Sequence, residues 1–165
     1  MHSVYFSLGS NLGNRMLNLK KAVNLLGKGI IQTPIYSSVY ETKAWGNTQQ
    51  PDFLNMVVKG VTKLTPLQLL NHCQEIEKTL GRKRIEHWGS RIIDIDILFY
   101  EDQVINIENL KIPHPYLHKR KFVLAPLKEI AAEFLHPILK KTIKTLYSTC
   151  EDDLNVCIFD TNQQI

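Results

Sequence analysis

Isoleucine and aspartate alternate between Ile93 and Ile97, and this short pattern constrains the fold more than any other feature of the chain. An alternation with a period of two residues predicts a β-strand with one buried face and one face that carries Asp94 and Asp96. Carboxylates two residues apart on a strand project to the same side, roughly 6–7 Å apart at the backbone. Magnesium is usually held by one or two carboxylates together with substrate phosphates, so the pattern favours a site for Mg²⁺ and a nucleotide.

Asp-Ile-Asp alone is weak evidence, because a half-buried strand with a solvated acidic face has the same pattern more often. The segment around this strand changes the balance, because arginines and a tryptophan accumulate in it: Arg82, Arg84, Trp88 and Arg91. A single surface arginine is usually a solvated charge. Several guanidinium groups beside paired carboxylates instead favour the binding of a polyphosphate.

Composition limits the class of protein. A chain of 165 residues, 44% of them hydrophobic, can bury a sizeable core, and we expect a single domain over residues 1–165. The net charge of +4 fits an anionic substrate as well as nucleic acid. Cys73, Cys150 and Cys157 lack metal-ligand spacing and are expected to be reduced thiols. The amino end has no signal-peptide pattern and no apolar run reaches a membrane-spanning length, so we expect a soluble cytoplasmic protein.

Hydrophobic periodicity predicts the order of the elements. We expect strands over residues 2–8, 31–41 and 53–63, in the Asp-Ile-Asp segment, and over residues 104–107. Helices are expected over residues 16–26, from Thr65 to a stop at Gly81, and near residues 119–124, 126–132 and 138–147. No Gly-Lys-Ser/Thr follows Gly9, so we expect the first strand to end there in a plain turn. The β-α-β-β-α-β order predicts a ferredoxin-like α+β sandwich with an extra hairpin and C-terminal helices.

Five short motifs occur within roughly residues 3–135: Gly9–Gly13, Gln50–Asn55, Gly81–Arg84, His87–Asp96 and Ile112–Pro115. In this order and at this spacing they resemble the 6-hydroxymethyl-7,8-dihydropterin pyrophosphokinase family of folate synthesis. Ser90 stands where proline is more usual in the family. The resemblance implies transfer of diphosphate from ATP to 6-hydroxymethyl-7,8-dihydropterin with release of AMP. It also implies two Mg²⁺ ions, the same fold, a monomer, and no nucleic-acid or membrane partner.

The resemblance also implies roles for individual residues. The metal ligands would be Asp94 and Asp96, and the catalytic group would add Arg82 and Arg91 to them. The ATP site would comprise Leu70, Gln74, Glu77, Arg84, Trp88, Arg91, Ile97, Lys111, His114, Tyr116 and Arg120. The pterin site would comprise Thr42, Ala44, Trp45, Phe53, Asn55, Trp88, Asp94 and Phe122. Trp45 and Phe53 stand where the family more often has a smaller apolar residue and a tyrosine.

Two other functions are compatible with parts of the pattern. RNA-recognition modules share the β-α-β-β-α-β order, although this chain lacks their aromatic-rich motif and its Asp-x-Asp face would repel phosphate without a metal. A two-metal nuclease would use paired carboxylates to degrade DNA or RNA. AMP formation from ATP that depends on added pterin would separate the transferase from both.

Overall fold

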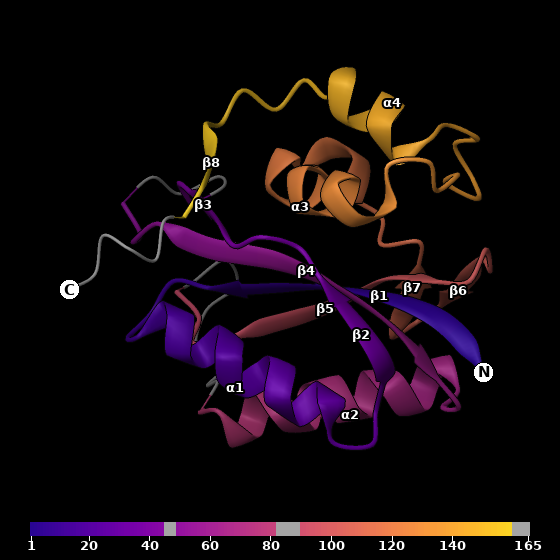
Figure 1. Ribbon diagram of the computed structural model, residues 1–165, viewed down its shortest axis with the longest axis horizontal. Helices are drawn as coiled ribbons and strands as arrows, with labels where there is room; N and C mark the ends of the chain where they lie inside the picture. The colour runs from indigo at the N-terminus through magenta and orange to yellow at the C-terminus, as the bar shows by residue number, and fades with distance from the viewer. Residues whose placement is uncertain (45–48, 82–89, 160–165) are drawn as a thin grey trace.

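Strands and helices occur in the predicted alternation in the computed structural model, which describes residues 1–44, 49–81 and 90–159 (Figure 1). The strands are β1 (His2–Ser10), β2 (Gln32–Tyr36), β3 (Tyr40–Thr42), β4 (Phe53–Thr62), β5 (Asp94–Tyr100), β6 (Ile105–Ile107), β7 (Leu110–Ile112) and β8 (Val156–Ile158). The helices are α1 (Arg15–Gly27), α2 (Pro66–Thr79), α3 (Lys121–Ala131) and α4 (Ile143–Ser148), with a short 3-10 helix at Leu117–Lys119.

The main sheet is antiparallel throughout the described pairs. Its order is β5-β1-β4-β3-β8, and β2 pairs with β4 beside β3. β6 and β7 form a separate hairpin, the extra hairpin that the sequence predicted. The two longest strands, β1 and β4, lie at the centre, and β5 forms one edge of the described sheet.

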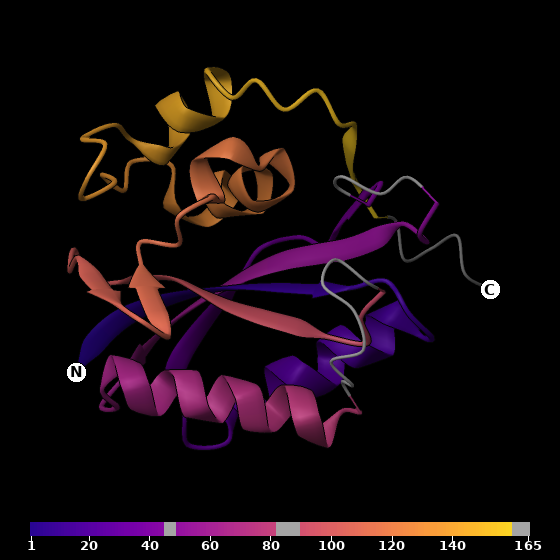
Figure 2. The ribbon, with the colours of Figure 1, turned by 180° about the vertical axis from the view of Figure 1, so that it is seen from behind.

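Helices cover both faces of the sheet. In Figures 1 and 2, α1 and α2 lie on one side, and α3 and α4 lie on the other. Because the side chains of β1 alternate, Phe6 and Leu8 pack into the core beneath α1 and α2, whereas Tyr5 packs with Leu124 on the side of α3. Every β1 residue from Val4 onward is therefore buried, because helices cover both faces of the sheet.

The start of α2 confirms a prediction made from local sequence. The Thr65 side chain accepts a hydrogen bond from the Gln68 backbone N–H at 3.3 Å, and the Gln68 side chain accepts one from the Thr65 N–H at 2.8 Å. Pro66 occupies the first helical position, and Gly81, with a φ of +93°, follows the helix end. These contacts satisfy the backbone groups that a helix leaves unpaired at its ends.

Two strand predictions need correction. β1 continues through Gly9 to Ser10, because Gly9 pairs with Asn55 on one side and Asp94 on the other. The strand expected over residues 31–41 is divided into β2 and β3. The Ser37 hydroxyl accepts a hydrogen bond from the Val57 backbone N–H at 2.9 Å, so a side chain replaces a ladder bond at the break.

The C-terminal third differs most from the prediction. The two helices expected on either side of residue 125 form one helix, α3. The helix continues through Pro126 because the residues around that proline are buried in the core between α3 and the sheet, which we call the second core. The helix expected over residues 138–147 begins only at Ile143, after a turn in which Lys140 has a φ of +54°. β8 was not predicted at all. No helix within the described ranges is long and apolar enough to cross a membrane.

Candidate active site

A cavity of about 540 Å³ opens on the α3 side of the sheet, and β1 forms its floor. Along this face of β1 the side chains become smaller, from Tyr5 through Ser7 to Gly9. Tyr5 fills the core beneath α3, whereas Ser7 and Gly9 line the cavity. The second core therefore ends at Tyr5, and the cavity begins at Ser7, two residues further along β1.

Pairing across the sheet places the two halves of the cavity in one row. Gly9 pairs with Asn55 of β4 and with Asp94 of β5, so the side chains of these two residues flank a position without a side chain. Two strand spacings separate them, roughly 10 Å. A Cβ atom on Gly9 would lie 2.8 Å from Asn55 Oδ1, so only glycine fits this position without displacing the amide.

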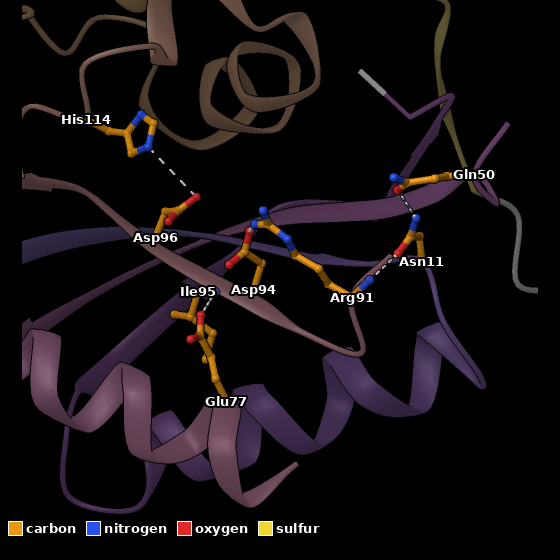
Figure 3. A network of polar contacts seen from close by, with 8 residues as sticks. All are labelled: Asn11, Gln50, Glu77, Arg91, Asp94, Ile95, Asp96 and His114. Atoms are coloured by element: carbon orange, nitrogen blue, oxygen red, sulfur yellow. Dashed lines mark hydrogen bonds and ion pairs between the residues drawn. The ribbon is translucent and has the colours of Figure 1, made fainter. Parts of the chain in front are cut away.

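Asp94 and Asp96 point into the cavity from β5, as the alternating pattern predicted (Figure 3). Arg91 forms an ion pair with the Asp94 carboxylate through Nη1. Asp96 Oδ2 lies 4.0 Å from His114 Nε2. A guanidinium and an imidazole thus lie next to the two carboxylates in the structure.

The electrostatic environment of Asp96 favours a bound cation. Burial raises its pKa to about 7, repulsion from Asp94 adds to the rise, and Arg120 opposes it. Because 42% of the Asp96 side chain remains exposed in the cavity, solvent weakens the effect of burial on its pKa. Repulsion from the neighbouring Asp94 carboxylate still acts to raise that pKa. Like charges held this close can be relieved by a proton or by a metal ion.

The described residues contain no group of three or more His, Cys, Asp or Glu side chains arranged to hold a metal ion. An ion at Asp94 and Asp96 would therefore take its remaining ligands from water and from a substrate. This donor set fits Mg²⁺, which keeps several waters and is commonly held by one or two carboxylates plus phosphate oxygens. It does not fit a structural zinc site, which needs four protein ligands.

Glu77 supports the strand between these aspartates. Its carboxylate is 6% exposed and accepts a hydrogen bond from the backbone N–H of Ile95 at 2.8 Å. β5 is an edge strand in this part of the sheet, so this N–H points away from the β1 ladder. The sequence analysis placed Glu77 on the nucleotide side of α2. The structure shows that it lines the cavity and also fixes the backbone that carries both aspartates.

Cationic and aromatic groups form the wall opposite the sheet. The Arg120 guanidinium lies 5.3 Å from the ring centroid of Tyr116 and 5.9 Å from that of Phe122. Burial lowers the pKa of Arg120, and the two aspartates of β5 act in the opposite direction. Burial likewise lowers the pKa of His114 to about 4, with Arg120 adding to the effect, so this imidazole is neutral near pH 7. Arginine with partly buried aromatic faces is suited to bind a phosphate and a flat ring in the same cavity.

Asn55 forms the polar end of the cavity. The residue is only 2% exposed, and its Nδ2 atom has no hydrogen-bond partner among the described residues. A buried amide donor without a partner costs free energy, so it indicates a ligand that would accept a hydrogen bond there. Phe53 and Phe122 line the same cavity, and both are partly buried.

Asn11 supports the site without lining the cavity, a role that the sequence analysis missed. Its side chain donates to Gln50 Oε1 at 3.2 Å and accepts from the Arg91 backbone N–H at 2.6 Å (Figure 3). It also donates to the Pro51 carbonyl at 3.1 Å. It therefore joins the segment before β4 to the segment before β5. The plain turn expected over residues 9–13 gives no sign of this role, which follows from the burial of Asn11 in the folded chain.

Most predicted site residues that the structure describes line this one cavity. They are Thr42, Phe53, Asn55, Leu70, Gln74, Glu77, Arg91, Asp94, Asp96, His114, Tyr116, Arg120 and Phe122. Ala44, Ile97 and Lys111 are not among the lining residues. Ile97 packs into the core beneath α1 and α2, Ala44 is buried outside the cavity, and Lys111 is exposed on β7. The predictions for Trp45, Arg82, Arg84 and Trp88 fall outside the described residues.

The fold and the cavity together define a class of protein. Paired carboxylates, arginines and a histidine that converge on one cavity are typical of enzymes that transfer phosphoryl groups, where positioning and charge stabilisation supply most of the catalysis.

Comparisons with known proteins identify the family within that class. Residues 5–132 match the family described as 7,8-dihydro-6-hydroxymethylpterin-pyrophosphokinase. A 2-amino-4-hydroxy-6-hydroxymethyldihydropteridine pyrophosphokinase of Aquifex aeolicus is 46% identical over 144 residues, which cover 87% of this chain and 89% of that protein. The enzyme of the same name from Haemophilus influenzae is 42% identical over 140 residues, which cover 83% and 86%.

Longer relatives contain the same unit. The mitochondrial folate synthesis bifunctional protein of Arabidopsis thaliana is 46% identical over 129 residues, which cover 78% of this chain and 23% of that protein. A solved structure of Plasmodium falciparum HPPK-DHPS has a TM-score of 0.72 at 21% identity, covering 90% of this chain and 43% of that one. The chain thus spans less than half of that solved structure, and the likeness shows a shared fold. The chain belongs to the 7,8-dihydro-6-hydroxymethylpterin-pyrophosphokinase family.

Proposed function

We propose that this pyrophosphokinase transfers diphosphate from ATP to 6-hydroxymethyl-7,8-dihydropterin in a Mg²⁺-dependent reaction that releases AMP. The observation that carries the proposal is the row across the sheet, in which Gly9 separates the amide of Asn55 from the carboxylate of Asp94. One cavity then holds a polar and aromatic end for a pterin and a charged end for a polyphosphate.

Asp94 and Asp96 are the proposed ligands of Mg²⁺. When bound, magnesium would neutralise phosphate oxygens and lower the pKa of the acceptor hydroxyl, and we propose two such ions. The protein contributes the placement of both carboxylates on one strand face. Glu77 keeps them there, because it holds the backbone N–H of Ile95 between them.

Arg91 and Arg120 are the proposed phosphate-binding groups among the described residues. In the structure Arg91 is paired with Asp94. If a cation bound at Asp94 and a phosphate bound at Arg91, each of these two residues would pair with a ligand in place of the other residue. Neither the carboxylate nor the guanidinium would then be left buried without an opposite charge. His114, which is neutral near pH 7, can donate or accept a hydrogen bond beside Asp96 without adding charge.

Asn55, Phe53 and Phe122 are the proposed pterin-binding groups. A pterin is flat and has a polar edge, so it needs aromatic faces and hydrogen-bonding groups in the same place. The buried Nδ2 of Asn55 supplies a donor, and Phe53 supplies a ring without the hydroxyl of a tyrosine. These residues lie in the same cavity as the two aspartates.

We further propose that the arrangement is ferredoxin-like and that the enzyme acts as a cytoplasmic monomer. The central order β5-β1-β4 with two helices on one face supports the first statement.

The decisive experiment is to incubate the protein with ATP, Mg²⁺ and 6-hydroxymethyl-7,8-dihydropterin and to separate the nucleotides. AMP that appears only when pterin and Mg²⁺ are both present supports the proposal, whereas ADP as the product contradicts it. Degradation or retention of RNA would favour one of the rival functions.

A further inference from the structure

Arg15 connects the two strand ends that border the pterin side of the cavity. It is the first residue of α1, and its Nη1 atom donates to the Glu41 carboxylate at 2.7 Å and to the backbone carbonyl of Asp52 at 2.8 Å. Glu41 is followed by Thr42 at the end of β3. Asp52 is followed by Phe53 at the start of β4. Thr42 and Phe53 pair with each other, and both line the cavity.

The C-terminal strand supports the same wall from the other side. β8 pairs with all of β3, from Tyr40 opposite Ile158 to Thr42 opposite Val156 (Figure 1). The next residue, Phe159, donates its backbone N–H to the Val39 carbonyl at 2.8 Å. We call residues 156–159 the C-terminal strap. It lies beyond residue 132, where the match to the family ends.

Arg15 and the strap are also in contact with each other. The Arg15 guanidinium lies 5.7 Å from the centroid of the Phe159 ring, and Phe159 packs against the core beneath α1. The Arg15 side chain is 22% exposed, and that of Glu41 is 35% exposed. An isolated surface ion pair contributes little, but this guanidinium has two oxygen acceptors and an aromatic face.

β3 depends on these contacts because it is short. It has three residues, and a strand of that length is not stable without partners on its edges. The wall must nevertheless be placed accurately, because a gap of about 0.5–1 Å removes roughly a quarter to a half of the van der Waals attraction between a ligand and the atoms beside it.

We propose that Arg15, Glu41 and the C-terminal strap form a positioning device that sets the affinity for the pterin without contacting it. Arg15 fixes the ends of β3 and β4, and the strap keeps β3 in the sheet. Arg15 is therefore a positioning residue. The inference rests on the proposed function, which assigns the pterin to this end of the cavity.

The test compares the Arg15→Gln variant with the wild type and with Glu75→Gln, which changes an exposed polar contact of 3.3 Å on α2 between His72 Nδ1 and the Glu75 carboxylate. We expect Arg15→Gln to raise the KM for the pterin by about five- to twentyfold, the usual size of coupling between sites, with kcat and the KM for ATP within about twofold. Arg15→Lys should restore most of the affinity, because an ammonium group can donate to both oxygens. Glu75→Gln should leave every constant unchanged.

Hydrogen exchange gives a second readout that needs no substrate. The amides of β3 should exchange faster in Arg15→Gln and in Phe159→Ala, whereas those of β1 and β5 should not. An unchanged pterin KM in Arg15→Gln, or an equal loss of affinity for both substrates, would overturn the inference. If the wild type forms no AMP with pterin, the proposed function fails and this inference fails with it; if the wild type is active and only the variant is unaffected, the inference alone fails.

Discussion

At the scale of single residues, the site depends on where side chains are small or absent. Gly9 separates Asn55 from Asp94, and Ser7 occupies the neighbouring position of the floor. Larger residues at these two positions would continue the core of Tyr5 and close the cavity. The charged residues supply the chemistry, but these small residues supply the space for it.

The first prediction concerns the two aspartates. Asp94→Asn and Asp96→Asn keep the shape of each side chain but remove the charge that would hold a cation. Turnover should therefore fall by about a thousandfold, which corresponds to the several kcal/mol of transition-state stabilisation that a metal ion supplies. Asp96→Asn should not lower the unfolding temperature, because it also removes the repulsion from Asp94 that raises the pKa of Asp96. Steady-state kinetics at saturating Mg²⁺ and thermal unfolding measure the two effects. Near-normal turnover in either variant would refute the metal assignment.

The second prediction concerns Gly9. In Gly9→Ala the new methyl group would lie 2.8 Å from Asn55 Oδ1 and force the amide to move. Pterin affinity should fall by roughly tenfold or more, as expected when a buried hydrogen bond is lost, while nucleotide affinity stays within about twofold. Isothermal titration calorimetry with each ligand measures this. Gly27→Ala is the matched control, since a Cβ at that position meets nothing within 4 Å. Equal losses for both ligands would show that Gly9 serves the fold alone.

Part of the site could be predicted from sequence because its residues stand in local patterns. Asp94 and Asp96 follow from alternation, the family motif over Gln50–Asn55 contains Asn55, and the resemblance as a whole implies Arg120. Asn11 could not be found in this way, because its role depends on three loops that meet only in the folded chain. The bond from Glu77 to the Ile95 N–H is hidden for the same reason, since the sequence does not state which strand edge lies against α2.

At the scale of elements, predictions succeeded where one element carries its own signals. α1, α2, β4 and β5 have clear periodicity, and α2 also has a complete capping box. α3 is interrupted in the sequence by Pro126, and β8 has only three residues. Pro126 removes one helical hydrogen bond, but burial of its neighbours Leu124 and Leu127 keeps the helix continuous. β8 forms only because β3 offers an edge, and no pattern in three residues reveals that partner.

The turn before α4 leads to the third prediction, on pH dependence. His136 is 3% exposed, and its Nδ1 atom accepts hydrogen bonds from the backbone N–H groups of Ile138 and Leu139, both at 3.2 Å. Burial lowers the pKa of His136 to about 4, with the nearby His118 adding to the effect. Because the folded pKa lies below the unfolded value near 6.5, this contribution to stability is complete above about pH 6.5 and is lost as the pH falls toward 4.

His136→Asn separates the hydrogen bonds from the titration, because Asn Oδ1 can accept at a similar position and does not gain a proton. Over that window the wild type should lose up to about 1.4 kcal/mol of unfolding free energy per pH unit through this one group. His114, whose pKa is also lowered to about 4, adds a similar dependence that the variant retains. Urea unfolding from pH 7 to pH 4 should therefore show a shallower slope for His136→Asn. Parallel slopes for the two proteins would contradict the assignment.

At the scale of the whole molecule, the cavity joins all three layers. Leu70 and Gln74 reach it from α2, Phe122 from α3, and Asn55 and Asp96 from the sheet. Figure 2 shows the sheet between the two helices. A ligand in this position contacts the sheet and also α2 and α3, which lie on opposite faces of it. Binding should therefore stabilise the fold as a unit, and the sequence could not predict this, because it gives the order of the elements but not their convergence.

The last prediction is that each substrate raises the unfolding temperature and that the two increments can be removed separately. A ligand that binds only the folded form at a hundred times its Kd adds about 2.7 kcal/mol, which corresponds to roughly 5–10 °C for a chain of this size. An ATP analogue with Mg²⁺ and the pterin should each produce such a shift in scanning calorimetry. Asp96→Asn should lose most of the nucleotide shift and keep the pterin shift, whereas Gly9→Ala should show the reverse. If both variants retain both shifts, the nucleotide does not bind at the Asp96 end of the cavity and the pterin does not bind at the Asn55 end.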